Sequence, residues 1–179
     1  MLTSKGNTMS TSVNNSTANL ETIKRFYTAF AQLDAAAMAA CYDDDVQFQD
    51  EVFNLNGKIQ TVGMWTMLCS ATAGNPKSKA AWHLDFSGVK ADATSGQAHW
   101  DANYLFSKTG RMVLNKIDAQ FTFNEAGLIV KHHDSFNFWA WARQALGAPG
   151  LLMGWTPYLR TKVQATANDN LQKFLAKKA

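Results

Sequence analysis

The sequence has few charged residues, two cysteines, and no apolar run that approaches the length of a membrane span. Charged residues make up 17% of the chain and hydrophobic residues 46%, a balance that excludes wholesale disorder. The formal net charge of +3 is small and the basic residues are scattered along the chain. The composition therefore favours a globular protein with one sizeable core, and it gives no reason to expect nucleic acid or a membrane as a partner.

The two cysteines, Cys41 and Cys69, show neither CxxC nor zinc-finger spacing. Both lie in segments that predict helix, so we expect two buried thiols in a reducing compartment. The N-terminal residues are rich in Ser, Thr and Asn and lack the apolar core of a Sec signal peptide. These features predict a cytoplasmic protein whose residues 1–18 form a flexible polar tail.

The hydrophobic period changes once along the chain, near residue 81. Before that point, apolar residues at helical spacing predict three helices, the first of them starting near Leu20, and a short strand that ends at Asp50. After it, apolar and polar residues alternate between turn signals, which predicts long antiparallel strands. Helices followed by strands indicate an α+β domain over residues 19–147. Residues 148–179 form a C-terminal extension that ends in a final helix.

Turn positions predict how the long strands pair. A four-residue loop after Phe106 places His99 opposite Asp118, and a four-residue loop after Phe123 places His133 opposite the same Asp118. The three side chains would then form a row on one face of the sheet. Histidine and carboxylate groups suit zinc, but no further ligand is identifiable. We therefore favour a hydrogen-bonded polar row over a metal site.

Four local motifs carry a likeness to a known superfamily. They are the helix Ile23-Lys24-Arg25-Phe26-Tyr27, the residue Asp34 that opens the second helix, the run from Cys41 to Asp50, and the hairpin from Phe123 to Ile129. With the order of the elements, they resemble the nuclear transport factor 2-like superfamily, in its SnoaL-like and ketosteroid isomerase-like branch. The stretch from His132 to Gly147 resembles a bacterial SnoaL-like subgroup without an assigned activity.

This resemblance covers roughly residues 20–140. It implies a cone-shaped fold, with N-terminal helices packed on a strongly curved, mainly antiparallel sheet around one apolar pocket. It also implies a homodimer, because members of this superfamily often pair through their sheets. The polar row of His99, Asp118 and His133 would then lie within the dimer interface.

The resemblance also places Asp50 where ketosteroid isomerases keep the carboxylate that moves a proton beside a steroid carbonyl. The groups that hold the oxyanion in that family have no counterpart here. The tyrosine position falls on Phe26, with Tyr27 one step around the helix. The protonated-aspartate position falls on Ala119, with Asp118 on the opposite face. The resemblance thus implies a proton shuttle without that oxyanion hole, and it disfavours steroid isomerisation by the usual mechanism.

Polar side chains on the apolar face of the predicted sheet form the candidate site. His132 and Asp134 are two residues apart on one strand, so they project to the same face. An apolar cavity with a few convergent polar groups is the usual form of a small-ligand site, and it raises the pKa of a carboxyl by desolvation. The predicted catalytic residues are Asp50, His132 and Asp134, and the predicted substrate-binding residues are Tyr104, Asn115, Trp100, Phe26, Tyr27 and Phe136.

These residues admit two functions, and the sequence leaves both open. In the first, the protein binds a small hydrophobic molecule and acts as an isomerase, cyclase or hydrolase by acid/base chemistry, with neither a cofactor nor a metal. In the second, it is a non-catalytic ligand-binding or dimerisation module, and the polar groups satisfy one another in a wet core. Turnover that depends on Asp50 or Asp134 separates the two.

Overall fold

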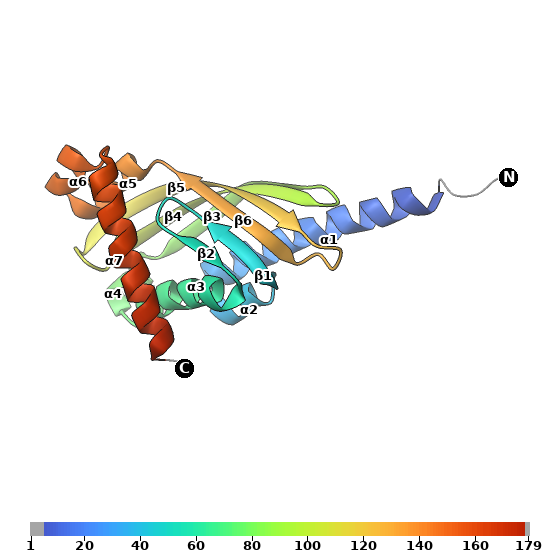
Figure 1. The fold of residues 1–179 in the computed structure, drawn as a ribbon, viewed down its shortest axis with the longest axis horizontal. Helices are drawn as coiled ribbons and strands as arrows, with labels where there is room; N and C mark the ends of the chain where they lie inside the picture. The colour runs from blue at the N-terminus through green and yellow to red at the C-terminus, as the bar shows by residue number, and fades with distance from the viewer. Residues whose placement is uncertain (1–5, 178–179) are drawn as a thin grey trace.

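A computed structural model describes residues 6–177, with side chains from residue 15 onward, as helices packed on one six-stranded sheet (Figure 1). The helices are α1 (Gly6–Ala31), α2 (Ala35–Ala39), α3 (Lys58–Ala73), α4 (Pro76–Ala81), α5 (Phe138–Leu146), α6 (Ala148–Met153) and α7 (Pro157–Ala176). The strands are β1 (Tyr42–Gln49), β2 (Asn54–Asn56), β3 (His83–Ala91), β4 (Ser95–Phe106), β5 (Arg111–Phe123) and β6 (Ile129–Phe136). This arrangement confirms the predicted α+β class.

The strands lie in the order β2-β1-β6-β5-β4-β3, and the sheet is mixed. Neighbouring strands run antiparallel except β1 and β6, which are parallel and place Phe48 opposite His132. The sequence predicted the antiparallel meander but not this parallel pair. Because strands β1 and β6 are far apart in the chain, no turn signal links them.

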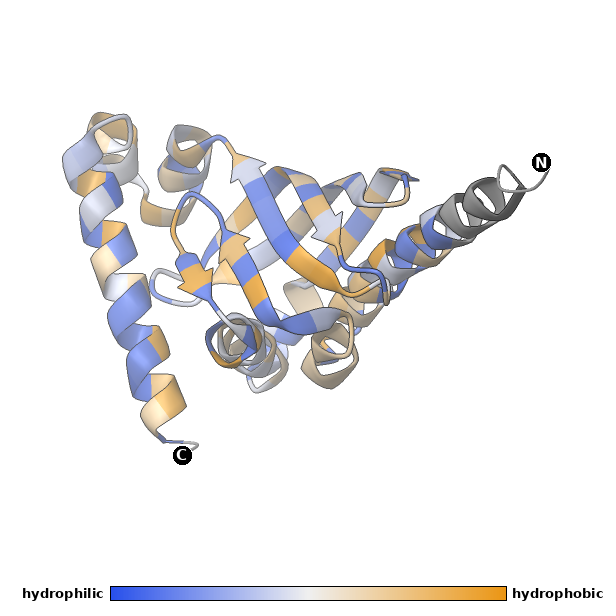
Figure 2. Cartoon of the chain, turned by 45° about the vertical axis from the view of Figure 1, so that its right-hand side comes forward, coloured by the Kyte–Doolittle hydropathy of each residue, from blue (hydrophilic) through white to orange (hydrophobic). Residues whose placement is uncertain are grey.

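One face of the sheet carries the core. Apolar and polar residues alternate along the strands (Figure 2), so that each strand turns one row of side chains toward the helices. Helix α1 packs against β3 and β4, and α3 packs against β1. The largest fully buried side chains are Tyr27, Tyr42, Phe26, Phe48, Ile23, Met38, Leu55, Met64, Ile117, Ile129, Leu171 and His132.

Helix α1 begins at Gly6 and not near Leu20, so the predicted tail is helical from residue 6 to residue 18. Residues 1–5 lie outside the described part of the chain. Ser, Thr and Asn are only modestly poorer helix formers than Ala, and lengthening an existing helix avoids the cost of nucleation. Side chains then tie the helix to the sheet, because Asn19 Nδ2 donates to the Asp92 carbonyl at 2.9 Å and Thr22 Oγ1 to that of Gly127 at 3.1 Å.

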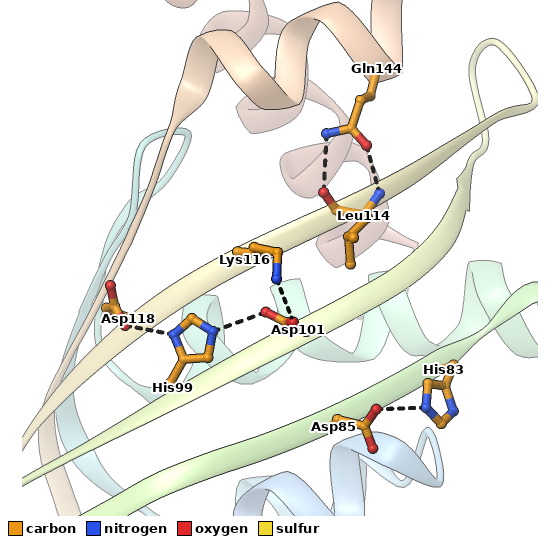
Figure 3. Close-up of polar contacts among 8 residues, drawn as sticks. All are labelled: His83, Asp85, His99, Asp101, Leu114, Lys116, Asp118 and Gln144. Atoms are coloured by element: carbon orange, nitrogen blue, oxygen red, sulfur yellow. Dashed lines mark hydrogen bonds and ion pairs between the residues drawn. The ribbon is translucent and has the colours of Figure 1, made fainter.

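The first predicted hairpin is confirmed. His99 pairs with Asp118, and Phe106 pairs with Arg111 across the loop. The polar side chains of this hairpin lie on the face away from the core, where a hydrogen-bonded row joins β4 and β5 (Figure 3).

The second predicted hairpin is two residues out of register. Asp118 lies opposite Ser135, and His133 lies opposite Gln120. The loop has five residues, 124–128, and a bulge follows at Thr122, so each contributes one residue of the shift. An even shift leaves every side chain on its predicted face. It does, however, take His133 away from Asp118, so the predicted three-residue row is wrong.

Both cysteines are buried and unpaired, as predicted. The final helix, α7, starts at Pro157, earlier than the apolar pattern suggested, with the Thr156 hydroxyl accepting from Leu159 N as its N-cap. Across residues 6–177, no helix has both the length and the apolar character needed to span a bilayer.

Glycines allow α6 to pack against α5 with its backbone in close contact. A Cβ atom at Gly150 would stand 1.9 Å from the carbonyl oxygen of Ala142, and one at Gly154 would stand 2.8 Å from Cδ1 of Trp139. No side chain fits at either place without separating the two helices. The sequence Gly150-Leu151-Leu152-Met153-Gly154 therefore determines which face of α6 points inward.

We expect Gly150→Ala to lower the free energy of unfolding by about 1–3 kcal/mol, because the added methyl group meets backbone atoms that cannot turn away. Urea denaturation followed by tryptophan fluorescence measures the change. Leu151→Ala, at the neighbouring exposed position, is the control and should stay within about 0.5 kcal/mol. Equal losses in the two variants would contradict the close packing of α5 and α6.

Candidate functional site

A continuous chain of hydrogen bonds crosses the core. Trp65 Nε1 donates to the Tyr42 hydroxyl at 3.0 Å, and that hydroxyl lies 2.6 Å from Nδ1 of His132. Nε2 of His132 lies 2.9 Å from Oδ1 of Asp134, to which Trp100 Nε1 also donates at 3.4 Å. Residues from α3, β1, β6 and β4 thus meet in one buried network.

Counting donors and acceptors assigns the protons of this network. The Tyr42 oxygen accepts from Trp65, so its own hydrogen is available for Nδ1 of His132. With that hydrogen bond to Nδ1 in place, Nε2 of His132 is the nitrogen that faces the Asp134 carboxylate as donor. The Tyr42 hydroxyl and both ring nitrogens of His132 are then paired, as a buried polar network requires.

Aromatic rings enclose the His132 side chain, which is 1% exposed. Its ring centroid lies 4.4 to 6.1 Å from those of Phe121, Phe48, Phe26, Tyr42 and Trp65. Both ring nitrogens are bonded to protein groups. His132 is therefore placed to orient Asp134 and not to touch a ligand itself.

Asp134 and Tyr27 each leave a polar atom unused. Within the described residues, Asp134 is hydrogen-bonded through Oδ1 alone, and the buried Tyr27 hydroxyl has no partner. Burial raises the pKa of Tyr27 well above its ordinary value, and the nearby charge of Asp134 raises it further. Unpaired polar atoms are rare in a core. These two would suit a small polar group of a bound molecule.

Asp50 lies just after β1, in the loop that leads to β2. Its Oδ1 accepts hydrogen bonds from the backbone N–H groups of Val52, at 2.7 Å, and of Phe53. Burial raises the pKa of Asp50 to about 7, although the two backbone donors lower it, and the charge of Asp134 raises it further. Such a carboxyl is populated in both protonation states near neutral pH, as an acid/base group must be.

Tyr104, on β4, lies close enough to Asp50 for the charge of Asp50 to act on its hydroxyl. Trp141 Nε1 donates to the Tyr104 oxygen at 2.9 Å, and no acceptor within the described residues takes the Tyr104 hydrogen. Burial raises the pKa of Tyr104 to about 12, the Trp141 donor lowers it, and the charge of Asp50 raises it. Tyr104 is therefore a protonated hydroxyl available to donate.

Helix α7 holds the loop that carries Asp50. Gln164 Nε2 donates to the carbonyl oxygen of Glu51 at 3.0 Å, and Arg160 Nη1 lies 2.8 Å from the carboxylate of the same residue. The predicted C-terminal extension thus contacts the residue next to the candidate acid/base group.

Asn115 lies on β5, opposite Ala102 of β4. With Trp141 and Gln144 it lines a hollow of about 290 Å³ between β5 and α5. Here β5 is paired with β4 alone, because β6 ends at Phe136 opposite Ile117. The Gln144 side chain bonds both backbone groups of Leu114, at 2.9 and 3.1 Å (Figure 3). Phe136 and Phe26 pack within the apolar core. The internal apolar pocket itself stays a prediction.

The face of the sheet away from the core carries the His99 row (Figure 3). His99 bonds Asp118 at 2.7 Å and Asp101 at 3.0 Å, and Lys116 bonds Asp101 at 3.0 Å. The hydrogen bond to Asp118 is the largest cause that raises the pKa of His99, and Asp101 adds to it. Within the described residues, no group of three or more His, Cys, Asp or Glu side chains is arranged to hold a metal ion.

Three residues of these networks were not predicted: Tyr42, Trp65 and Trp141. Tyr42 is the first residue of β1. Its contact with His132 depends on the parallel pairing of β1 with β6, which the sequence does not encode locally. The tryptophans were assigned to core or wall, and indole N–H donors usually find partners when buried.

The chain matches the family described as SnoaL-like domain over residues 23–132, and no curated protein gives a significant match. A candidate polyketide cyclase from Xanthomonas campestris pv. campestris has a similar structure, with a TM-score of 0.58, 16% identity, and coverage of 73% of this chain and 98% of that chain. An LEH-like epoxide hydrolase from M. tuberculosis gives 0.58, 15%, 76% and 94% for the same quantities.

A protein with a ketosteroid isomerase-like fold from Catenulispora acidiphila, in complex with trimethylamine, gives a TM-score of 0.59 at 14% identity. The match covers 76% of this chain and 98% of that one. Identities this low establish the fold alone. The coverages show that about three quarters of this chain aligns with nearly the whole of each relative.

We expect Tyr42→Phe to lower the free energy of unfolding by about 1–3 kcal/mol, because it leaves Nδ1 of His132 and the indole N–H of Trp65 without partners. Tyr27→Phe is the matched control, because it removes a buried hydroxyl that has no partner. That variant should be as stable as the original chain or more stable by up to about 1 kcal/mol. Denaturation curves decide, and a larger loss in Tyr27→Phe would contradict the network.

The raised pKa of Asp50 predicts a pH dependence of stability. Between its ordinary value of 3.8 and about 7, the folded state binds more protons than the unfolded state. The free energy of unfolding should therefore fall as pH rises through this window. Asp50→Asn should remove most of this fall, which at 1.36 kcal/mol per unit comes to roughly 4 kcal/mol. Asp45→Asn, at an exposed position of β1, should leave it unchanged, and parallel curves for all three proteins would contradict the shift.

Proposed function

Because the chain belongs to the SnoaL-like domain family, we propose that it binds a small hydrophobic molecule and moves a proton on it without a cofactor. Asp50 is the acid/base group of this proposal. The observation that carries it is the Asp50 carboxyl itself: one oxygen is held by two backbone N–H groups, and burial brings its pKa to about 7. A carboxyl held in this way can take up a proton and return it near neutral pH.

The neighbours of Asp50 support an assignment of roles. Asp50 would remove a proton from a carbon next to a carbonyl or similar group, and the free hydrogen of Tyr104 would stabilise the negative charge on the substrate oxygen. The hydrogen bond from Trp141 fixes the direction of the Tyr104 hydroxyl. The proton that Asp50 holds then returns to a second carbon in an isomerisation, or to the oxygen of the attacked carbonyl in a cyclisation. In a hydration, Asp50 would instead take its proton from the attacking water.

The remaining predicted residues shape the site in this proposal. Asp134, oriented by His132, offers its unused oxygen to a polar group of the ligand, and Tyr27 offers its hydroxyl. Trp100, Phe136 and Phe26 supply apolar walls. Proteins of the same fold include an LEH-like epoxide hydrolase and one solved with trimethylamine, which is in keeping with a small organic ligand here.

A non-catalytic module is the second candidate, and one observation favours it. The chain from Trp65 through Tyr42 and His132 to Asp134 satisfies its own members and is enclosed by aromatic rings. Such a network rigidifies a core whether or not catalysis occurs. In this reading the protein binds a ligand or a second copy of itself, and Asp50 has no chemical role.

Turnover of a panel of ketones, enols and epoxides tests the proposal. We expect Asp50→Asn to lower the rate by about 10²- to 10⁴-fold, because no other group replaces the transferred proton. With Asp50 as base, the rate of the original chain should rise with pH up to about 7 and then level off. Asp45→Asn serves as the control and should retain full activity.

Two outcomes would overturn the catalytic assignment. One is turnover that survives Asp50→Asn. The other is binding of a panel compound, measured by tryptophan fluorescence, that neither Asp50→Asn nor Asp134→Asn alters while no turnover is found. The second result would establish the non-catalytic module instead.

The homodimer is likewise a proposal. The polar row of His99, Asp101, Lys116 and Asp118 lies on the sheet face that a second copy would cover. Sedimentation velocity of the whole chain gives the oligomeric state directly.

A further inference from the structure

Helix α6 turns its large apolar side chains outward. Leu151, Leu152 and Met153 are 54%, 71% and 41% exposed, while Gly150 and Gly154 are buried. A surface helix of a globular protein normally does the reverse, with its apolar stripe facing the core. Exposed apolar side chains that gather in one place usually mark a binding surface.

The outward set extends beyond α6. We call it the apolar tip, and it consists of Trp139, Leu151, Leu152, Met153, Trp155 and Tyr158. Trp155 and Tyr158 are 71% and 66% exposed. Hydrogen bonds fix the two indoles, since Trp139 Nε1 donates to the Leu151 carbonyl at 3.4 Å and Trp155 Nε1 to that of Leu152 at 3.2 Å.

Because α6 packs closely on α5, the large side chains of the tip cannot turn inward. The space beneath α6 is filled by backbone, because a Cβ at Gly150 or Gly154 would already collide. The tip lies where α5, α6 and the start of α7 meet at one end of the molecule (Figure 1). It also lies outside residues 23–132, which carry the family match.

The segment that carries the tip has charged residues of one sign. The chain contains no Asp or Glu from residue 135 to residue 168, but it contains Arg143, Arg160 and Lys162. The Arg143 guanidinium lies 4.9 Å from the centre of the Trp139 ring, and Lys162 follows Tyr158 by one helical turn. Arg160 is paired with Glu51. Arg143 and Lys162 therefore add basic charge to the tip.

This charge argues against a second copy as the occupant. A two-fold contact through the tip would bring Arg143 and Lys162 of both copies together, and like charges across an interface are unfavourable. The exposure of Leu152, Trp155 and Tyr158 also means that these side chains protrude. Protruding side chains insert into a partner, whereas a peptide ligand needs a groove to lie in.

We propose that the apolar tip docks on an anionic lipid surface. Trp and Tyr side chains sit favourably at the headgroup level of a bilayer, Leu side chains enter the acyl boundary, and Arg143 and Lys162 would contact anionic headgroups. The chain would lie on the membrane as a peripheral protein. Composition alone does not predict a membrane partner. The feature that indicates one is the outward orientation of the apolar side chains of α6, which composition does not show. This proposal does not depend on the chemistry of Asp50.

Co-sedimentation with vesicles tests it on the whole chain. We expect binding to phosphatidylcholine vesicles that contain phosphatidylglycerol, little binding to vesicles of phosphatidylcholine alone, and release at high salt. The double variant Leu152→Ser with Trp155→Ser should lower the partition to the mixed vesicles by about tenfold or more. Arg143→Gln with Lys162→Gln should weaken it and reduce its dependence on salt.

Ile59→Ser is the matched control, because Ile59 is 80% exposed but lies on α3, away from the tip. That variant should bind like the original chain, and thermal unfolding confirms that each variant folds. Three results would overturn the proposal. They are no binding to mixed vesicles, an equal loss in Ile59→Ser, and an oligomer that the Leu152 and Trp155 double variant converts to a monomer.

Discussion

Strand β1 runs parallel to β6, and this pairing determines where the polar groups of the core meet. It sets Phe48 opposite His132, and it brings the Tyr42 hydroxyl to Nδ1 of His132. The loop after β1 is thereby carried close enough to β6 for the charges of Asp50 and Asp134 to influence each other. Without the β1–β6 pair, the network through His132 and the candidate acid/base group would be separate features of the chain.

A buried imidazole and carboxylate persist only when their hydrogen bonds offset the cost of leaving water. Trp65, Tyr42 and Trp100 provide those bonds, so the pair of His132 and Asp134 is stable in an aromatic core. The same bonds restrict what the pair can do. Asp134 keeps one unused oxygen, whereas His132 keeps no free nitrogen. Asp50 differs from both, because its two donors are backbone groups of its own loop.

The sequence predicted the structural features that are set by residues close together in the chain. Helical spacing located α3, alternation located the strands, and the loop after Phe106 gave the register of β4 and β5. It also placed His132 and Asp134 on one face, a result that survives a register error of two residues. The predicted start of α1 was wrong, because the composition of the N-terminal residues suggested a loose tail. Lengthening an existing helix costs little free energy, so these residues are helical from Gly6.

Features that depend on residues far apart in the chain could not be predicted from the sequence. No local signal announces that β1 pairs with β6, so Tyr42 was not recognised as the partner of His132. The bulge opposite Thr122 and Phe123, where Val130 is the extra residue of β6, likewise has no signal in the alternating pattern. Gly150 and Gly154 interrupt the apolar segment in the sequence, but the sequence does not show that they face inward. The contact with Ala142 shows that the glycines of α6 face the core side and its large apolar side chains face outward.

The C-terminal extension connects two regions that would otherwise be independent. Helix α7 begins beside the apolar tip at Tyr158, and two turns later its Gln164 side chain bonds the carbonyl of Glu51, next to Asp50. Arg160 lies between them and pairs with the Glu51 carboxylate. Helix α7 thus contacts the Asp50 loop from the same element that carries part of the apolar tip. The backbone donors that lower the pKa of Asp50 belong to that loop, next to the Glu51 carbonyl that Gln164 holds.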